Sequence, residues 1–284
     1  MTEQAIARPA LYLVATPIGN LEDITLRALR VLKQVDLIAC EDTRQTQKLL
    51  NHYGIEKPTV SYHEHNEMTR AAELVVGAEE GRAIALVSDA GMPGISDPGF
   101  RLITLAIRHH IPVIPIPGPA AFVAALVASG LPTDSFRFSG FLPAKAGARR
   151  KVLEEIRNSP RTQVFYDAPH RLQETLQDIV DVLGPERHVV VAREVTKIHE
   201  EFLRGRAAEI LEKISGHEVK GEITLLIAKA EAPAPGAAPK KQSARARLRE
   251  IADEGKLDEK AALKRLAKEL GVSKSEAYRR VQQS

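Results

Sequence analysis

The sequence predicts an α/β protein with two α/β domains and a small helical C-terminal appendage. Three observations support this prediction. Short apolar runs alternate with segments of helical spacing along the first 130 residues, the alternation restarts after a Pro- and Gly-containing break at 131–151, and a Pro/Ala stretch precedes a charged tail. The expected parts are an N-terminal α/β domain at 1–135, a C-terminal α/β domain at 136–230, a Pro/Ala linker at 231–242 and a basic helical tail at 243–284.

The first domain opens with the apolar run "ALYLVATP", which predicts a strand, and continues with the helical spacing of "DITLRALRVLKQV". Further strands are expected at "DLIACED", "PTVSYHEHN", "AIALVSD" and "IPVIPIPG", and further helices at 43–54, 68–80, 100–109 and 119–130. Gly54 and Gly81 follow two of these helices, where glycine commonly ends a helix. Short buried strands that alternate with helices indicate a mostly parallel sheet covered by helices on both faces.

The second domain repeats this alternation after the break. Its segments are "KVLEEIR", "TQVFYDAP", "HRLQETLQDIVDVLG", "HVVVARE", "GRAAEILEKIS" and "EITLLIAKA". After the linker, "LDEKAALKRLAKELGVSKSEAYRRVQ" predicts a helix, a turn at a glycine, an N-cap at Ser273 and a second helix. The tail therefore has the proportions of a helix-turn-helix, although helical hairpins without a nucleic-acid partner are common.

Composition bounds the class and the compartment. Hydrophobic residues make up 44% and charged residues 27% of the chain, as in ordinary globular proteins. The single cysteine, Cys40, argues against a disulfide scaffold or a cysteine-based metal site and favours a reducing compartment. The first ten residues lack the apolar core of a signal peptide, and no stretch reaches the roughly 18 apolar residues of a membrane helix. We therefore expect a cytoplasmic protein without a membrane partner.

Basic charge is concentrated in the tail. Residues 240–284 hold 13 Lys and Arg against 7 Asp and Glu, a net charge of +6, whereas the whole chain carries only +3. Residues 1–239 are therefore slightly acidic. A basic appendage on such a body is the pattern expected of a protein that binds a polyanion, because Lys and Arg supply much of the affinity for nucleic-acid phosphates. A solvated helical face is the alternative interpretation.

Several familiar sites are not supported by the motifs. The loop after "IALV" spaces its glycines unlike a dinucleotide-binding loop, no phosphate-binding P-loop is present, and no serine lies in a nucleophile elbow. His63 and His65 alternate along an expected strand, but no third ligand accompanies them, so we expect no metal. What remains is a set of polar, Gly- and Pro-containing loops at the strand ends, including "TPIGNLEDIT", "CEDTR", "SYHEHNE", "SDAGMPGISDPG" and "PGPAA".

These loops predict a ligand site. In an open parallel sheet, ligands bind beyond the carboxyl ends of the strands, and glycine lets the backbone approach a flat ligand closely. A site rich in backbone groups suits a nucleoside-like cofactor. Within "SDAGMPGISDPG" the first half is expected to hold the ligand. Asp97 is expected to be the N-cap of the helix at Phe100, with Pro98 at the first helical position.

The strand-end motifs, together with "FSGFLP", "FYDAPHR" and "REVTKIHEEFLRG", resemble those of the tetrapyrrole-methylase superfamily of S-adenosylmethionine-dependent methyltransferases. The resemblance covers roughly residues 10–230 in eight ordered motifs, and it is greatest to the branch that methylates a cytidine ribose 2′-oxygen in the decoding centre of 16S rRNA. It implies a cofactor between two α/β domains, a homodimer, and 16S rRNA or the small ribosomal subunit as partner. Where the family pattern has a serine and a glutamate, this chain has Ala120 and Asp167.

The resemblance also implies positions for the site residues. The cofactor-binding residues it implies are Pro17, Ile18, Ser88, Asp89, Ala90, Gly91, Met92, Ala120, Ala121, Tyr166, Gly221 and Glu222. No catalytic residue is singled out; acidic and basic candidates in the matched motifs are Asp42, Glu64, Lys197 and Glu201, beside Asp23 and Glu41. Candidates for holding RNA are Arg44, His65, Asn66, Arg171 and Arg193. For each of these, a helix cap or an ion pair is an equally good interpretation.

Three function classes follow. The first is an rRNA ribose methyltransferase, in which a general base near the hydroxyl would assist a reaction that depends mostly on positioning. The second is a methyltransferase of a tetrapyrrole-like small molecule, which has no need of a basic tail. The third is a non-catalytic RNA-binding protein on the same fold, which predicts no cofactor binding. We further hypothesise that "EDTR" and "YHEHNE" face the RNA.

Overall fold

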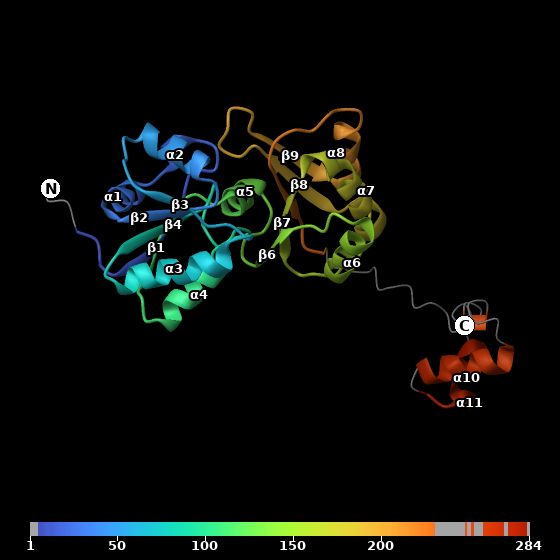
Figure 1. Cartoon of the computed structure of the whole chain (residues 1–284). Helices are drawn as coiled ribbons and strands as arrows, with labels where there is room; N and C mark the ends of the chain where they lie inside the picture. Colours follow the sequence, from blue (N-terminus) through green and yellow to red (C-terminus); the bar gives the residue numbers. More distant parts are fainter. Residues whose placement is uncertain (1–4, 231–247, 249–250, 253–257, 270–271, 283–284) are drawn as a thin grey trace. The chain divides into compact units, whose positions relative to one another are not determined.

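The computed structural model describes residues 5–230, 248, 251–252, 258–269 and 272–282. The chain divides into two compact units, residues 1–230 and residues 231–284. The expected linker at 231–242 and the first residues of the expected tail lie outside the described residues. The larger unit holds two five-stranded sheets (Figure 1).

The first sheet is entirely parallel, with the strand order β3-β2-β4-β1-β5. Its strands are β1 (Ala10–Val14), β2 (Leu37–Cys40), β3 (Thr59–Ser61), β4 (Ala83–Val87) and β5 (Val113–Ile116). β1 and β4 are buried along their whole length, as a strand covered on both faces must be. β4, β1 and β5 are neighbours, so the loops that follow them meet at one edge.

Helices cover both faces of this sheet, as the sequence predicts (Figure 1). α1 (Leu26–Gln34) and α2 (Thr43–His52) pack on one face through Val31, Leu32 and Leu50. α3 (Glu67–Glu79) and α4 (Phe100–Arg108) pack on the other face through Leu74 and Leu102. The expected helix boundaries agree with these to within a few residues, and a short 3-10 turn, η1 (Leu21–Asp23), precedes the N-cap of α1.

The second sheet is mixed, with the order β6-β7-β10-β8-β9. Its strands are β6 (Phe136–Phe141), β7 (Thr162–Asp167), β8 (His188–Arg193), β9 (Glu201–Arg206) and β10 (Ile223–Ile227). β6 and β7 are parallel, whereas β10 runs antiparallel to both of its neighbours and β9 is antiparallel to β8. The start of β10 therefore lies beside the ends of β7 and β8.

This sheet is also packed on both faces. α6 (Ala146–Ile156), α7 (Leu172–Leu183), which follows the 3-10 turn η2 (Pro169–Arg171), and α8 (Ala207–Ile214) cover one face. α5 (Ala121–Ser129) covers the other through Ala125 and Leu126. The expected domain boundary at 135/136 thus falls after a helix that packs on the second sheet.

Two strands of the second sheet have no counterpart in the sequence prediction. β6 lies inside the segment taken as a break, where every residue of "FRFSGF" is exposed or half-buried. β9 lies in "REVTKIHEEFLRG", where alternation is again weak. Both are edge strands, so neither needs the continuous apolar run that marks a central strand. Helix α6 also begins five residues before the expected "KVLEEIR".

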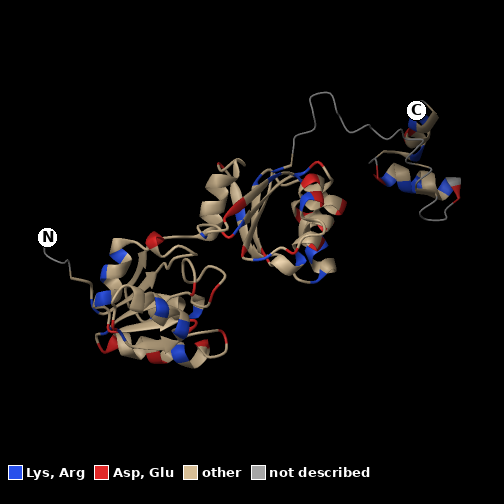
Figure 2. Ribbon diagram, turned by 90° about the horizontal axis from the view of Figure 1, so that it is seen from above, with Lys and Arg blue, Asp and Glu red and all other residues tan. Residues whose placement is uncertain are grey.

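The smaller unit contains α10 (Glu259–Glu269) and α11 (Lys274–Gln282) around a small core that includes Leu248, Leu266 and Ala277. The Ser273 hydroxyl accepts a hydrogen bond from the backbone N–H of Glu276 at 3.2 Å, which confirms the predicted N-cap. Lys and Arg outnumber Asp and Glu on these two helices (Figure 2). No helix among the described residues is both long enough and apolar enough to cross a membrane.

Candidate functional site

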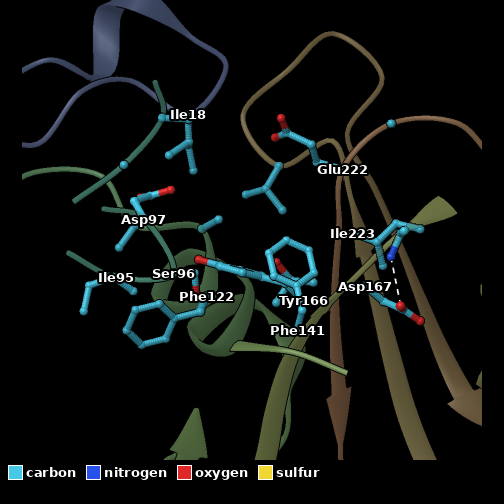
Figure 3. Close-up of a pocket in the computed structure, with 18 of the residues that line it drawn as sticks. Ile18, Ile95, Ser96, Asp97, Phe122, Phe141, Tyr166, Asp167, Glu222 and Ile223 are labelled. Carbon is cyan, nitrogen blue, oxygen red and sulfur yellow. Dashed lines mark hydrogen bonds between the residues drawn. The ribbon is translucent and has the colours of Figure 1, made fainter. Parts of the chain in front are cut away.

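A cavity of about 340 Å³ lies between the carboxyl edge of the first sheet and the neighbouring edge of the second sheet (Figure 3). Its first wall comes from the loops after β4, β1 and β5, and its second wall from the ends of β6, β7 and β8 and the start of β10. A cavity of this size at the strand ends of an α/β sheet is typical of a small-molecule site.

The first wall is fastened by backbone contacts. Thr16 and Gly91 exchange two backbone hydrogen bonds, and the Thr16 hydroxyl donates to the carbonyl of Ser88 at 2.9 Å. Gly91 has φ +85°, a region that favours glycine, and a Cβ there would face Ile18 and the carbonyl of Pro119. The loops after β1, β4 and β5 therefore form one surface with little side-chain bulk.

The first wall carries one carboxyl group, Asp97, which has no basic partner among the described residues. Burial, with the nearby carboxylates of Glu41 and Asp89, raises the pKa of Asp97 to about 7, against a smaller opposing hydrogen bond from Ser88. Burial also raises the pKa of Glu41 and of Asp89, and each lies in the field of other carboxylates. This wall therefore favours a positively charged ligand, whose charge would replace protons held by these groups.

The start of β10 and Gly221, which precedes it, form part of the second wall. Ile223 pairs with Asp167 of β7 and Arg193 of β8, so the residues before β10 reach the cavity. A Cβ on Gly221, at φ +93°, would collide with the side chain of Glu194. Burial raises the pKa of Tyr166, whose ring meets Phe141 edge-on with centroids 5.5 Å apart. This wall offers an aromatic surface with a hydroxyl.

The carboxylates of the second wall are matched by basic side chains. Arg171 Nε lies 2.5 Å from Asp167 Oδ1, which also accepts from the N–H of Ala168 (dashed line in Figure 3). Lys197 Nζ lies 2.8 Å from Glu194 Oε1 and 3.2 Å from Glu222 Oε2. Burial opposes the charge of Lys197, but these two carboxylates outweigh it and raise the Lys197 pKa.

The structure brings together most of the cofactor-binding residues that the resemblance implies. Those that line the cavity are Ile18, Ala90, Gly91, Met92, Ala120, Ala121, Tyr166, Gly221 and Glu222. Pro17, Ser88 and Asp89 do not line it. Ser88 is buried, and its hydroxyl donates to the carbonyls of Ala90 and Gly91, while Asp89 accepts from the N–H of Asp42 at 3.1 Å.

The four catalytic candidates do not converge on the cavity. Asp42 is the N-cap of α2, and hydrogen bonds from the side chain and backbone of Arg44 lower its pKa to about 2, which makes it a poor base. Lys197 is ion-paired, and Glu201 is paired with Arg193 at 3.0 Å. Glu64 is exposed and lies in a second, open groove next to the cavity.

The RNA-binding candidates have mixed surroundings. Arg44 is exposed, and His65 is exposed beside His63, their rings 5.9 Å apart in the loop after β3. Asn66 precedes α3, where its side chain accepts from the N–H of His63 and donates to Ser61. Arg171 is 11% exposed and is held by Asp167 and the carbonyl of Leu142; Arg193 is held by Glu201 and the carbonyl of Lys220. Arg44 and His65 are the two that face solvent.

One residue of the site was assigned wrongly from the sequence. Asp97 is not the N-cap of α4, and Pro98 is not its first residue. The helix begins at Phe100, Gly99 occupies the cap position with φ +157°, and no side chain caps the helix. The loop turns tightly, with a Cβ on Gly99 meeting the backbone of Gly94 at 3.2 Å, and Asp97 lies at the cavity instead. Ile95, Phe122 and Phe141 also line the cavity without having been singled out (Figure 3).

The residues present fit S-adenosylmethionine. One buried oxygen, Asp167 Oδ2, has no hydrogen-bond partner among the described residues, as expected if a ligand amine or hydroxyl donates to it. The acidic first wall suits a cationic sulfonium, and the Phe141 and Tyr166 rings suit a nucleoside. Across the described ranges, no group of three His, Cys, Asp or Glu side chains could hold a metal ion.

Comparison with known proteins gives close relatives. Residues 10–211 match the family of tetrapyrrole (corrin/porphyrin) methylases. The chain is 55% identical over 225 residues to the ribosomal RNA small subunit methyltransferase I of Halalkalibacterium halodurans, covering 79% of this chain and 78% of that protein. It is 47% identical over 268 residues to the protein of the same name from Synechocystis, covering 94% and 95%.

Solved structures share the fold at low identity. The uroporphyrin-III C-methyltransferase of Thermus thermophilus superposes with a TM-score of 0.54 at 23% identity, covering 78% of this chain and 95% of that one. A diphthine synthase superposes with a TM-score of 0.57 at 13% identity, covering 77% and 90%. These likenesses confirm the α/β fold with two sheets and carry no information on the substrate.

Proposed function

The chain belongs to the tetrapyrrole methylase family and its cofactor is S-adenosylmethionine, and from this premise we propose that it methylates 16S rRNA of the small ribosomal subunit. The modified atom is the ribose 2′-oxygen of a cytidine in the decoding centre, and the enzyme works in the cytoplasm as a homodimer. The relatives named ribosomal RNA small subunit methyltransferase I support the substrate. The atom, the nucleotide, the compartment and the dimer come from the sequence resemblance.

The observation that carries the proposal is the cavity with its two unlike walls. The first wall presents Asp97, which has no basic partner in the part of the chain that the structure describes, while Asp167 and Glu222 of the second wall are ion-paired. A cationic ligand between the two walls would have its positive charge balanced by Asp97 on one side. Its uncharged parts would pack against the second wall on the other side. This arrangement fits a sulfonium nucleoside.

When bound, the cofactor would supply a methyl group on a positively charged sulfur, for transfer to the ribose oxygen. The task of the chain is therefore to hold two reactants in line, and such positioning accounts for most of the rate in this kind of reaction. Asp97 lies both in the cofactor cavity and in the adjoining groove. Its carboxylate can attract the sulfonium and, once ionised beside that charge, can accept a hydrogen bond from the ribose hydroxyl and take up its proton.

The small C-terminal unit supplies a basic surface for RNA. Arg279 and Arg280 of α11 are largely exposed, each within reach of Glu276, and Tyr278 beside them is half exposed. Phosphate neutralisation by such residues provides affinity that falls as salt rises. Deletion of residues 240–284 should therefore weaken binding to small subunits and flatten its salt dependence, while leaving cofactor affinity unchanged. An unchanged salt dependence would remove the tail from the RNA interface.

The alternatives make different predictions. A non-catalytic RNA-binding protein would show no heat of binding with S-adenosylmethionine in calorimetry. A methyltransferase of a tetrapyrrole-like molecule would bind the cofactor but would show no salt-dependent binding to small subunits. The fold likeness to a uroporphyrin methyltransferase, at 23% identity, does not favour that substrate.

Mass mapping of 16S rRNA from cells that lack this protein tests the proposal. We expect one ribose methyl group to be missing from a decoding-centre cytidine and to return when the wild-type gene is restored. Expression of the Asp97→Asn variant in the same strain should restore the protein to its wild-type level but should not restore the methyl group. An unchanged methylation pattern in the deletion strain would overturn the proposed function.

A further inference from the structure

A second hollow adjoins the cofactor cavity on the first domain. This outer groove is lined by Glu64 and Glu67 on one side and by the 96–100 segment, Ser96 to Phe100, on the other. Ser96 and Asp97 line both hollows, so the outer groove adjoins the end of the cofactor cavity that carries Asp97. A group seated in the groove would therefore lie next to the reacting centre.

The 96–100 segment points its side chains in two directions. Ser96 has φ +62°, and Gly94 and Gly99 also adopt positive φ, so the segment folds back on itself. The turn brings Asp97 to the cavity and leaves Phe100 at the surface. Positive φ at a non-glycine residue is costly and often marks a functional loop. Here it occurs at the residue that joins the two hollows.

Phe100 is an unusual residue for the first turn of an amphipathic helix. The buried face of α4 is made by Leu102 and Ala106, and Phe100 is 80% exposed, so it contributes little to the core. An exposed phenylalanine at the rim of a groove offers a flat surface on which a nucleobase can stack, as in many proteins that bind single-stranded RNA.

The polar side of the outer groove is acidic. Glu67 is paired with Arg101 at 3.3 Å, whereas the exposed Glu64 carboxylate has no hydrogen-bond or ion-pair partner in the part of the chain that the structure describes. Such a groove repels phosphates and attracts hydrogen-bond donors. Among the pyrimidines, cytosine presents an amino group at C4, which can donate a hydrogen bond to a glutamate carboxylate. Uracil presents a carbonyl oxygen at the same position, which the carboxylate repels.

We propose that the outer groove holds the cytosine base of the substrate nucleotide, stacked on Phe100, with Glu64 accepting a hydrogen bond from its 4-amino group. This inference rests on the proposed function and adds the residues that select the base. It explains how the ribose of that nucleotide reaches Asp97, because the groove and the cavity share that residue. The phosphates stay outside the groove, because its carboxylates repel them.

Kinetics on small subunits from cells lacking the enzyme test the stacking. Phe100→Ala in the full-length protein should raise KM for the subunit by at least about fivefold, since stacking of one base on an aromatic ring is worth about that factor or more. Phe100→Tyr should restore KM, and cofactor affinity measured by calorimetry should stay at the wild-type value in both. Ile107→Ala, on the same helix and 59% exposed, is the matched control and should behave as wild type.

A substrate in which the target cytidine is replaced by uridine tests the carboxylate. Wild-type enzyme should prefer cytidine by about tenfold or more, and Glu64→Gln, which can donate to a carbonyl oxygen, should reduce that preference toward unity. An unchanged KM in Phe100→Ala, or an unchanged preference in Glu64→Gln, overturns the inference. The inference is also overturned if Phe100→Ala changes the sedimentation coefficient of the enzyme without changing KM, since Phe100 would then lie in a contact between two copies of the enzyme.

Failure of the proposed function gives a different result. If the wild-type protein transfers no methyl group to small subunits, the function itself is wrong and the variants cannot differ. If wild type methylates the subunit while the variants keep wild-type KM and base preference, only the outer groove is wrongly assigned. The wild-type rate on the subunit therefore separates the two cases.

Discussion

The two walls of the cofactor cavity treat their carboxyl groups in opposite ways. On the first wall, burial and the carboxylates of Glu41 and Asp89 behind it raise the pKa of Asp97, and burial also raises the pKa of those two groups. On the second wall, Asp167 and Glu222 are held by Arg171 and Lys197. The carboxylates of the second wall have counter-ions, so among their buried oxygens in the described residues only Asp167 Oδ2 is left to accept from a ligand, whereas the raised pKa of Asp97 on the first wall is a cost that a cationic ligand relieves.

The largest expected effect comes from breaking the pairing of the second wall. Arg171→Ala leaves the fully buried Asp167 side chain without its counter-ion, and loss of one partner of a buried ion pair costs about 3–5 kcal/mol of unfolding free energy. Urea denaturation measures the loss. Arg193→Ala breaks a more exposed pair with Glu201 and should cost no more than about 1 kcal/mol. If the two variants lost the same unfolding free energy, the Asp167 carboxylate would not depend on Arg171 for its stability.

The next effect concerns the unpaired wall. Asp97→Asn keeps the shape of the side chain and removes the negative charge that attracts the sulfonium. S-adenosylmethionine should therefore bind about 10- to 150-fold more weakly, a loss of about 1.5–3 kcal/mol, the size of one interaction with a charged group. Calorimetry at pH 8 measures the change. The exposed Asp134→Asn is a matched control and should leave the affinity unaltered. Wild-type affinity in Asp97→Asn would show that the first wall does not select a cation.

The site itself could be located from the sequence only in part. The loops after β1, β4 and β5 were identified because parallel strands end at one edge and their glycines and prolines are local signals. Asp97 was missed because "SDPGF" matches the start of a helix, and only the fold shows that Gly99 takes the cap position. The second wall depends on antiparallel β10 lying between β7 and β8, a long-range pairing with no local signal. Its residues came from family resemblance.

A smaller effect is the pH dependence of stability. The folded protein keeps a proton on Asp97 up to about pH 7, whereas an unfolded aspartate loses it near pH 4, so this group makes unfolding easier as pH rises between these values. The contribution is about 1–2 kcal/mol after allowance for partial exposure. Asp97→Asn should therefore be more stable than wild type at pH 8 and equal to it at pH 4.

Cofactor affinity should follow the opposite course. A bound cation favours the ionised carboxylate, so affinity in wild type should rise as pH increases from about 6 to 8, and Asp97→Asn should lack this rise. Calorimetry across this range measures both proteins. A parallel rise in the variant would assign the titration to another group, of which Glu41, Asp89 and Tyr166 are the neighbours.

The smallest effect is expected at the partly exposed ion pairs of the second wall. Lys197→Met removes the partner of Glu194 and Glu222 at a site that solvent reaches, so stability should change by no more than about 1 kcal/mol. The freed Glu222 carboxylate faces the cavity and should strengthen cofactor binding slightly, by less than about fivefold. A large loss of affinity would mean that Lys197 contacts the cofactor directly.

Transfer of a labelled methyl group tests the account most directly. Purified protein is incubated with methyl-labelled S-adenosylmethionine and small subunits from cells that lack it, and the digested 16S rRNA is analysed by mass spectrometry. We predict one labelled methyl group on the ribose of one decoding-centre cytidine with wild-type protein, and almost none with Asp97→Asn at the same cofactor concentration. Label on a base, label at many sites, or no label with wild-type protein would contradict the account.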